Sequence, residues 1–369
     1  GYMMAVIAPS RRIRRTPFTD GVEAAGVKGY TVYNHMLLPT VFRSVQEDYH
    51  HLKKAVQIWD VSVERQVELR GPDAARLMQM LTPRDLRGML PGQCYYVPIV
   101  DETGGMLNDP VALKLSEDRW WISIADSDLL FWVKALAYGY RLDVLVDEPD
   151  ISPLAVQGPL ADDLMARVFG DAVRAIKFFR FGWFDFQGVS MAVARSGYSK
   201  QGGFEIYVDG TKNGMPLWNA LMEAGKDLDV YAGCPNLIER IEGGLLSYGN
   251  DMTRENTPHE CGLGRFCSTQ TAIGCVGRDA LLRVAKEGPT QQIRAIAIDG
   301  DIPVCDQVWP IIAKGKRVGQ VTSAAKSPDY DTSVAIGMVR MTHWDQDTVL
   351  EVQTQDGPRT ATVHENFWI

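Results

Sequence analysis

The chain has 369 residues, a length that favours two or three domains over one. Hydrophobic residues make up 46% and charged residues 23%, as in soluble globular proteins, and no apolar run approaches membrane-spanning length. The net charge of -8 argues against a nucleic-acid partner, which would require a basic face. No signal peptide is visible, so we expect a cytoplasmic protein.

The cysteine pattern predicts neither a metal site nor a redox pair. Six cysteines occur, and none forms a Cys-x-x-Cys pair. Buried or free thiols in a reducing compartment are therefore expected. The glycine patterns of dinucleotide-binding and Walker motifs are also absent from the sequence.

An arginine run at 10–15, Ser-Arg-Arg-Ile-Arg-Arg, leaves two interpretations. It either binds phosphate or another polyanion, or forms a solvated or ion-paired arm. The acidic total favours the second interpretation.

The first half of the chain mixes single helices with strands. We expect helices at 47–55, 74–81 and 129–137, and strands at 67–69, 119–125 and 142–146. Asp73 suits the N-cap of the second helix, and Ser123 lies in an apolar strand. This mixture predicts an α+β fold rather than a doubly wound parallel sheet.

Residues 95–114 have the pattern of a β-hairpin. Apolar residues run up to Val100 and resume at Met106, and Gly104 and Gly105 suit the tight turn between them. Asp109 follows between apolar neighbours and before a proline, which lacks an amide donor and favours a strand edge or bulge. Asp109 is a candidate site residue; a solvated surface hairpin is the alternative.

A second block begins near residue 154. Its strand, Gly-Pro and helix pattern repeats the one near residue 69, which predicts two related α+β subdomains. In the strand at 204–208, apolar residues alternate with Glu205 and Tyr207. After a glycine-rich approach, these two side chains form a candidate ligand-facing pair; an exposed edge strand is the alternative.

The last third changes from helix to strand. We expect a helix beginning at Asn236 and running toward residue 251. Beyond Gly288 the composition favours short strands, predicted at 293–298, 310–313, 317–321, 334–339 and 349–352.

Several of these stretches resemble one family. The motifs are Gly-Gly-Met-Leu-Asn-Asp at 104–109, Gly-Gly-Phe-Glu at 202–205, Tyr-Gly-Asn-Asp at 248–251, Thr-Pro-His-Glu at 257–260 and Gly-Gln-Val-Thr-Ser at 319–323. From 16 to 339 the chain resembles the aminomethyltransferase family, to which the glycine cleavage T-protein belongs. The resemblance implies a three-domain α+β fold. Residues 1–285 would form a folate-binding core of two interleaved α+β subdomains, one at about 61–150, and residues 286–369 a β-barrel.

The resemblance also implies a site. Its folate-binding residues would be Tyr96, Asp109, Val111, Phe179, Glu205 and Tyr207, and its substrate-binding residues Tyr33, Ser123, Tyr198 and Tyr207. The loop after Thr16-Pro17 lines the central cavity in relatives, so Tyr30 and His35 are further candidates, with a structural histidine equally supported. Two departures stand out: Asn108 replaces an aspartate, and Asn236 an arginine that meets the folate tail.

The loops at 30–35 and 197–203 are more similar to sulfonium demethylases of this family than to T-proteins. They imply methyl transfer from dimethylsulfoniopropionate to N5 of tetrahydrofolate, with Asp109 as the catalytic residue. Demethylation of a methylated amine or betaine, aminomethyl transfer as in glycine cleavage, and a folate-binding protein without turnover stay open. We expect small-molecule partners, no metal, no nucleic acid and no membrane, and leave a homodimer open.

Overall fold

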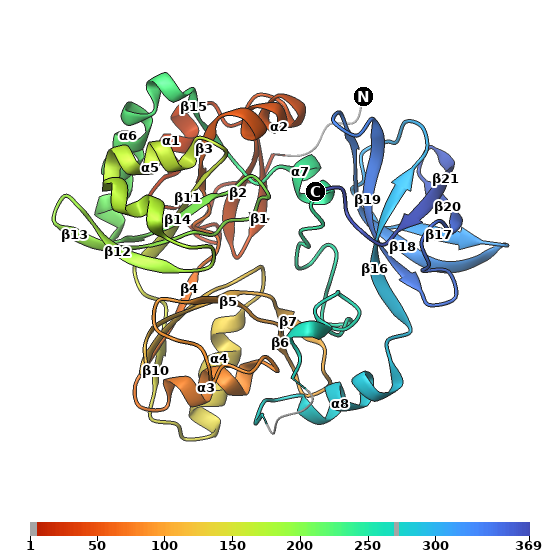
Figure 1. Ribbon diagram of the computed structural model, residues 1–369, viewed down its shortest axis with the longest axis horizontal. Coiled ribbons are helices and arrows are strands. Elements are labelled where there is room, and N and C mark those ends of the chain that lie inside the picture. The colour runs from red at the N-terminus through yellow and green to blue at the C-terminus, as the bar shows by residue number, and fades with distance from the viewer. Residues whose placement is uncertain (1–5, 269–272) are drawn as a thin grey trace.

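The computed structural model describes residues 6–268 and 273–369, which build two open sheets, a barrel and two small hairpins (Figure 1). The five-stranded sheet has the order β10-β4-β9-β8-β5, and the six-stranded sheet the order β12-β13-β14-β11-β3-β15. The closed barrel has the order β16-β19-β18-β17-β20-β21. The pairs β1-β2 and β6-β7 form the hairpins.

The strands of the five-stranded sheet are β4 (Gln66–Arg70), β5 (Cys94–Tyr96), β8 (Val111–Ser116), β9 (Arg119–Ser123) and β10 (Leu145–Asp147). Those of the six-stranded sheet are β3 (Val56–Asp60), β11 (Ile151–Gln157), β12 (Phe181–Phe186), β13 (Val189–Ala194), β14 (Gly203–Asp209) and β15 (Val230–Gly233). The barrel holds β16 (Gln291–Ile298), β17 (Trp309–Ala313), β18 (Lys316–Ser327), β19 (Thr332–Arg340), β20 (Val349–Thr354) and β21 (Gly357–His364). The hairpins are β1 (Gly29–Tyr33) with β2 (Met36–Val41), and β6 (Ile99–Val100) with β7 (Met106–Asn108).

The α-helices are α1 (Thr19–Ala24), α2 (Val45–Lys54), α3 (Ala74–Leu81), α4 (Leu129–Gly139), α5 (Ala161–Phe169), α6 (Gly214–Ala224), α7 (Leu237–Glu242) and α8 (Arg278–Glu287). Short 3-10 helices lie at Asp171–Ala175, Thr211–Asn213, Lys226–Leu228 and Gly264–Phe266. No helix within 6–268 or 273–369 is long and apolar enough to cross a membrane.

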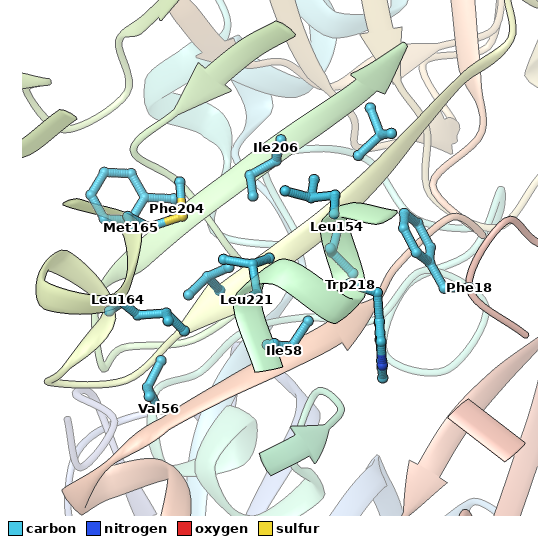
Figure 2. Packing of buried hydrophobic residues seen from close by; sticks show 14 of the residues in the cluster. Phe18, Val56, Ile58, Leu154, Leu164, Met165, Phe204, Ile206, Trp218 and Leu221 are labelled. Carbon is cyan, nitrogen blue, oxygen red and sulfur yellow. The ribbon is translucent and has the colours of Figure 1, made fainter. Parts of the chain in front are cut away.

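The alternation of β14 explains how the core is layered. Phe204, Ile206 and Val208 point to one face, where they pack against apolar side chains of α5 and α6 (Figure 2). Tyr207 points to the other face and packs in a cluster with Trp121 of β9 and Leu113 of β8. The two open sheets therefore meet through their inner faces, while α3 and α4 cover the outer face of the five-stranded sheet (Figure 1).

The barrel is joined to the rest of the chain by buried polar contacts. Arg240 of α7 pairs with Asp251 at 2.9 Å, and Ser323 of β18 bonds to both side chains. Glu242, also on α7, accepts hydrogen bonds from Tyr49 of α2 and Ser327 of β18. These contacts hold α7 between the six-stranded sheet and the barrel.

The structure confirms the predicted α+β class, and the two Gly-Pro repeats both form strand, turn and helix, β4 into α3 and β11 into α5. The helix expected from Asn236 is much shorter than predicted because Gly243 and Gly244 follow it, and Gly244 has a φ of +67°. In the barrel, β18 is longer than predicted, and β21 was not anticipated from its polar sequence.

Candidate functional site

The β6-β7 hairpin presents Asp109 at the end of a tightly held turn. The Asp101 carboxylate accepts hydrogen bonds from the amides of Thr103 at 2.9 Å and Gly105 at 3.1 Å. Gly104 has a φ of +83°, whereas Gly105 does not need a positive φ; a Cβ there would instead lie 2.2 Å from the Arg254 carbonyl oxygen. Asp109 then falls in the break between β7 and β8, beside Pro110.

The pKa of the Asp109 carboxyl group is raised in the folded protein. The Tyr96 hydroxyl donates to its Oδ2 at 2.5 Å, and the side chain stays partly exposed. Burial raises the pKa of Asp109 to about 7, and the charge of Asp251 adds to this, while the hydrogen bond from Tyr96 lowers it. A carboxyl group with a pKa near 7 suits proton transfer at neutral pH.

Asn108, one of the two departures noted in the sequence, links this turn to the segment that follows β9. Its Nδ2 donates to the Ala125 carbonyl at 2.9 Å and to Ser127 Oγ at 2.8 Å, while its Oδ1 accepts from the Ala125 amide. An aspartate could not make the two donations, because an ionised carboxylate has no N–H group. In this chain the residue therefore ties β7 to the end of β9.

Glu205 lies on the inner face of the six-stranded sheet, one pleat from Tyr207. Its side chain is 5% exposed, and Ser196 Oγ donates to its Oε1 at 2.8 Å. No salt bridge to it is found in the described parts of the chain. A carboxylate in this position can accept two parallel N–H bonds from a planar heterocycle.

Tyr207 and Ser123 meet across the two sheets. Tyr207 is 1% exposed, packs against the Trp121 ring at 5.9 Å, and has its pKa raised well above the usual range by burial and by the charge of Glu205. Gln66 Nε2 donates to Ser123 Oγ at 3.0 Å, so the Ser123 hydroxyl is already held by one hydrogen bond.

Val111 and Phe179 complete the apolar wall beside Tyr207. Phe179 has a φ of +56°, and its backbone is held on both sides, by the Cys94 amide and the Arg195 carbonyl. Positive φ is uncommon for a bulky residue, so these bonds fix the ring's position. The six residues predicted to bind folate therefore lie on β5 and β8 of one sheet, on β14 of the other, and in the loops before β8 and β12.

Among the residues predicted to bind substrate, Tyr33 and Tyr198 lie near Asp109. Burial and the charges of Glu64 and Asp109 raise the pKa of Tyr33 well above its usual range. The Tyr198 hydroxyl donates to the carbonyls of Leu245 at 2.8 Å and Leu246 at 2.7 Å, which fixes its ring.

The other N-terminal candidates point elsewhere. Tyr30 donates to Glu23 at 2.9 Å, and His35 pairs with the exposed Asp128 at 2.9 Å. The arginine run follows the ion-paired interpretation, with Arg14 on Glu148 and Arg15 on Asp20, each at 2.7 Å.

The structure adds Glu64, which the sequence analysis missed. It lies in the turn between β3 and β4, where its carboxyl group interacts electrostatically with Glu205. Burial, the charge of Glu205 and that of Asp109 raise its pKa well above the usual range. The only local signal was a charged residue at the entry to a buried strand, too common a pattern to indicate a site.

The side chains of Arg240 and Asn236 make hydrogen bonds within the fold. Arg240 is held by Asp251 and Ser323, as described above. Asn236 caps α7, accepting hydrogen bonds from the amides of Ile238 at 3.0 Å and Glu239 at 3.2 Å. Its Nδ2 donates to the Val45 carbonyl.

Two family models match the chain: the GCVT N-terminal domain over residues 18–271 and the glycine cleavage T-protein C-terminal barrel domain over 291–368. The chain belongs to the glycine cleavage T-protein family. It is 63% identical to the dimethylsulfoniopropionate demethylase DmdA of Ruegeria pomeroyi, covering 99% of this chain and 100% of that protein. It is 28% identical to an aminomethyltransferase of Bacillus pumilus, over 93% and 95% of the two chains.

A solved structure has the same fold. The glycine cleavage system aminomethyltransferase T from Bartonella henselae superposes with a TM-score of 0.87 at 23% identity, covering 97% of this chain and 98% of that one. This likeness confirms the three-part aminomethyltransferase fold predicted from the motifs.

Proposed function

We propose that this enzyme demethylates dimethylsulfoniopropionate, moving a methyl group from its sulfonium to N5 of tetrahydrofolate. The products are methylmercaptopropionate and 5-methyltetrahydrofolate. The observation that carries the proposal is the 63% identity to a dimethylsulfoniopropionate demethylase over nearly the whole of both chains. Asp109 and Glu205 offer carboxylates to the pterin, and the tyrosines near them offer aromatic rings to the sulfonium.

The pterin would lie between the inner faces of the two sheets. Glu205 offers a buried carboxylate to the aminopterin N–H edge, and Phe179, Val111 and Tyr207 offer apolar contact to the ring. The Tyr96 and Asp109 pair would then lie toward N5. This arrangement fits a planar heterocycle with one polar edge.

The transfer is an in-line displacement. The N5 lone pair forms the new N–CH₃ bond, the S–CH₃ bond breaks, and its electron pair stays on sulfur as a neutral thioether. Because N5 is a neutral nucleophile, no prior deprotonation is required, and positioning supplies much of the rate. Positive charge moves from sulfur to N5, where the Asp109 carboxylate stabilises it and accepts the N5 proton that the new ammonium must lose.

Aromatic faces would hold the sulfonium, which has no N–H donor. The rings of Tyr33, Tyr198 and Tyr207, whose hydroxyl groups all sense the charges of the site acids, are the proposed faces, and a ring face attracts a cation by about 0.5–2 kcal/mol. Ser123 is proposed to donate to the substrate carboxylate while its oxygen accepts from Gln66. A related cation, such as a betaine, would find the same rings, so the donor must be tested directly.

The test is a donor screen by mass spectrometry. Purified protein is incubated with tetrahydrofolate and, separately, dimethylsulfoniopropionate, glycine betaine, dimethylglycine and sarcosine. We expect 5-methyltetrahydrofolate and methylmercaptopropionate from dimethylsulfoniopropionate alone, and no turnover without folate. Faster product formation from an ammonium donor, or turnover without folate, would contradict the proposal.

We also propose the domain division at residues 285 and 286 and a cytoplasmic location. The boundary falls in the last turn of α8, which ends at Glu287, and the first barrel strand, β16, begins at Gln291. The location is supported by the six cysteines, all of which are free thiols. Limited proteolysis at the segment between α8 and β16 tests the first proposal.

A further inference from the structure

Two arginines meet at one aromatic ring beside the candidate site. The centroid of the Phe266 ring lies 4.6 Å from Cζ of Arg84 and 4.4 Å from Cζ of Arg265. Arg84 Nη1 donates to the Tyr96 carbonyl at 2.7 Å. Arg265 Nη1 donates to the Gly262 carbonyl, also at 2.7 Å. Two like charges at one ring repel each other, and an anion bound by both would relieve that repulsion.

The described parts of the chain supply no such anion. Within residues 6–268 and 273–369, no salt bridge to Arg84 or Arg265 is found. Burial lowers the pKa of Arg84, and the charge of Arg265 lowers it further, while Tyr95 opposes the change. A guanidinium group has five N–H donors, so one bond to a carbonyl leaves donors for a ligand. Arg84 is half-buried and Arg265 is exposed, which leaves the pair within reach of solvent.

The same ring connects the arginines to the proposed position of N5. Phe266 packs edge-on against Tyr96, with 5.9 Å between the ring centroids, and the Tyr96 hydroxyl donates to Asp109. In tetrahydrofolate, C6 is bonded directly to N5 and carries the p-aminobenzoylglutamate tail. With the pterin N–H edge on Glu205 and N5 toward Asp109, the tail would therefore leave the pterin at the Tyr96 end of the site.

We propose that Arg84 and Arg265 form a carboxylate-binding subsite for the glutamate tail of tetrahydrofolate, with Phe266 in contact with the p-aminobenzoyl ring. This inference rests on the proposed function and adds the residues that recognise the tail. The planar guanidinium fork matches the two oxygens of a carboxylate. Arg84 is also stacked on the Tyr95 ring at 4.0 Å, so its side chain would lose little freedom when the tail binds.

The experiment compares two ligands that share the pterin ring and differ in the tail. Tetrahydrofolate and 6-methyltetrahydropterin, which has no tail and no carboxylate, are titrated calorimetrically into the parent protein, Arg84→Met and Arg265→Met. Methionine keeps an unbranched apolar side chain and removes the guanidinium group. The control is Arg317→Met, which removes one positive charge from an exposed position of the barrel. Each titration is repeated at higher salt, which screens ion pairs near the surface.

We expect Arg84→Met and Arg265→Met each to lower the ratio of tetrahydrofolate to 6-methyltetrahydropterin affinity about tenfold, as for a lost hydrogen bond between charged groups. Arg317→Met should leave the ratio unchanged. Added salt should lower the ratio more in the parent than in either variant. Because Arg265 is exposed, its variant decides the test if Arg84→Met does not fold.

Two results would overturn the inference. One is an unchanged affinity ratio in the folded variants. The other is a weaker affinity for dimethylsulfoniopropionate with an unchanged ratio, which would assign the arginines to the carboxylate of the methyl donor. A parent protein that binds tetrahydrofolate more tightly than 6-methyltetrahydropterin but transfers no methyl group from the sulfonium overturns the proposed function instead.

Discussion

Acidic side chains are buried both where α7 meets the barrel, a region called here the junction, and in the candidate site. Only at the junction is a buried acid paired with a basic side chain. Asp251 accepts hydrogen bonds from Arg240, Thr322 and Ser323, so its charge is paired and its oxygens are used. In the site, no salt bridge to Glu205 or Asp109 is found within the described residues, and the side chains that donate to them are the hydroxyl groups of Ser196 and Tyr96. The difference distinguishes acids whose charge is paired within the fold from acids that we propose bind the ligands.

We expect the largest loss of stability from a substitution at the junction. Asp251→Ala leaves Arg240 buried without its partner, so we expect a loss of about 3–5 kcal/mol in the free energy of unfolding. Denaturant titration measures it. Asp20→Ala, which removes the exposed pair with Arg15, is the matched control and should cost less than about 1 kcal/mol. Equal losses of unfolding free energy in the two variants would show that the buried pair stabilises the fold no more than the exposed pair does.

Asp109→Asn should affect turnover rather than folding. The amide still accepts the Tyr96 hydrogen bond but can neither stabilise positive charge at N5 as a carboxylate does nor take its proton. We expect kcat to fall about 100-fold, a typical contribution of general acid–base catalysis, with a smaller change in KM. Steady-state kinetics with saturating tetrahydrofolate measure this, and a normal kcat would make Asp109 a structural residue.

The pH dependence follows from the same group. The pKa of Asp109 is about 7 in the folded protein and near 4 when unfolded, so the carboxylate needed for transfer forms as pH rises through 7. We expect kcat/KM to rise across that range, and Tyr96→Phe to move the inflection upward because it removes a bond that lowers the pKa. A flat profile between pH 6 and 8 would exclude this role.

Whereas kcat/KM should rise with pH, the contribution of Asp109 to folding stability should fall. Between pH 4 and 7 the folded state holds a proton on Asp109 that the unfolded state has lost, so this group's contribution to stability falls as pH rises. Above pH 7 the loss is complete. Asp109→Asn should therefore gain thermal stability relative to the parent at pH 8 but not at pH 4, as differential scanning calorimetry at both values would show.

The sequence predicted the parts of the site that local pattern determines. The hairpin before Asp109 and the alternation around Glu205 follow from turn glycines and a period of two. Glu64 could not be found this way, because Glu205, with which it interacts, lies far along the chain, as Ser323 does from Arg240. Asp73 illustrates the same limit: α3 begins where predicted, but the Asp73 carboxylate accepts from the Asp143 amide instead of capping the helix.

Glu205→Gln should weaken folate binding without a comparable loss of folding stability. The amide presents an N–H group where the pterin also has one, leaving polar groups mispaired at a cost of about 1–3 kcal/mol. Calorimetric titration with tetrahydrofolate measures this. Ser196→Ala serves as the companion variant, since it removes only the internal hydrogen bond to Glu205. Unchanged affinity in Glu205→Gln would remove Glu205 from the folate site.

The smallest effect is expected at the Tyr198 ring. Its hydroxyl is fixed by the carbonyls of Leu245 and Leu246, so the ring would lose little entropy on binding the cation that we propose it contacts. Tyr198→Leu removes the face and should raise KM for dimethylsulfoniopropionate by a factor equivalent to about 0.5–2 kcal/mol, with tetrahydrofolate affinity little changed.

Two further variants separate the ring from its hydroxyl. Tyr198→Trp keeps an aromatic face and should keep activity, and Tyr198→Phe keeps the face while releasing the two carbonyls. If the face is what binds the cation, the phenylalanine variant stays closer to the parent in KM than the leucine variant does. If Phe and Leu raise KM equally, Tyr198 acts by holding the 245–246 backbone, and the cation is bound by other rings of the site.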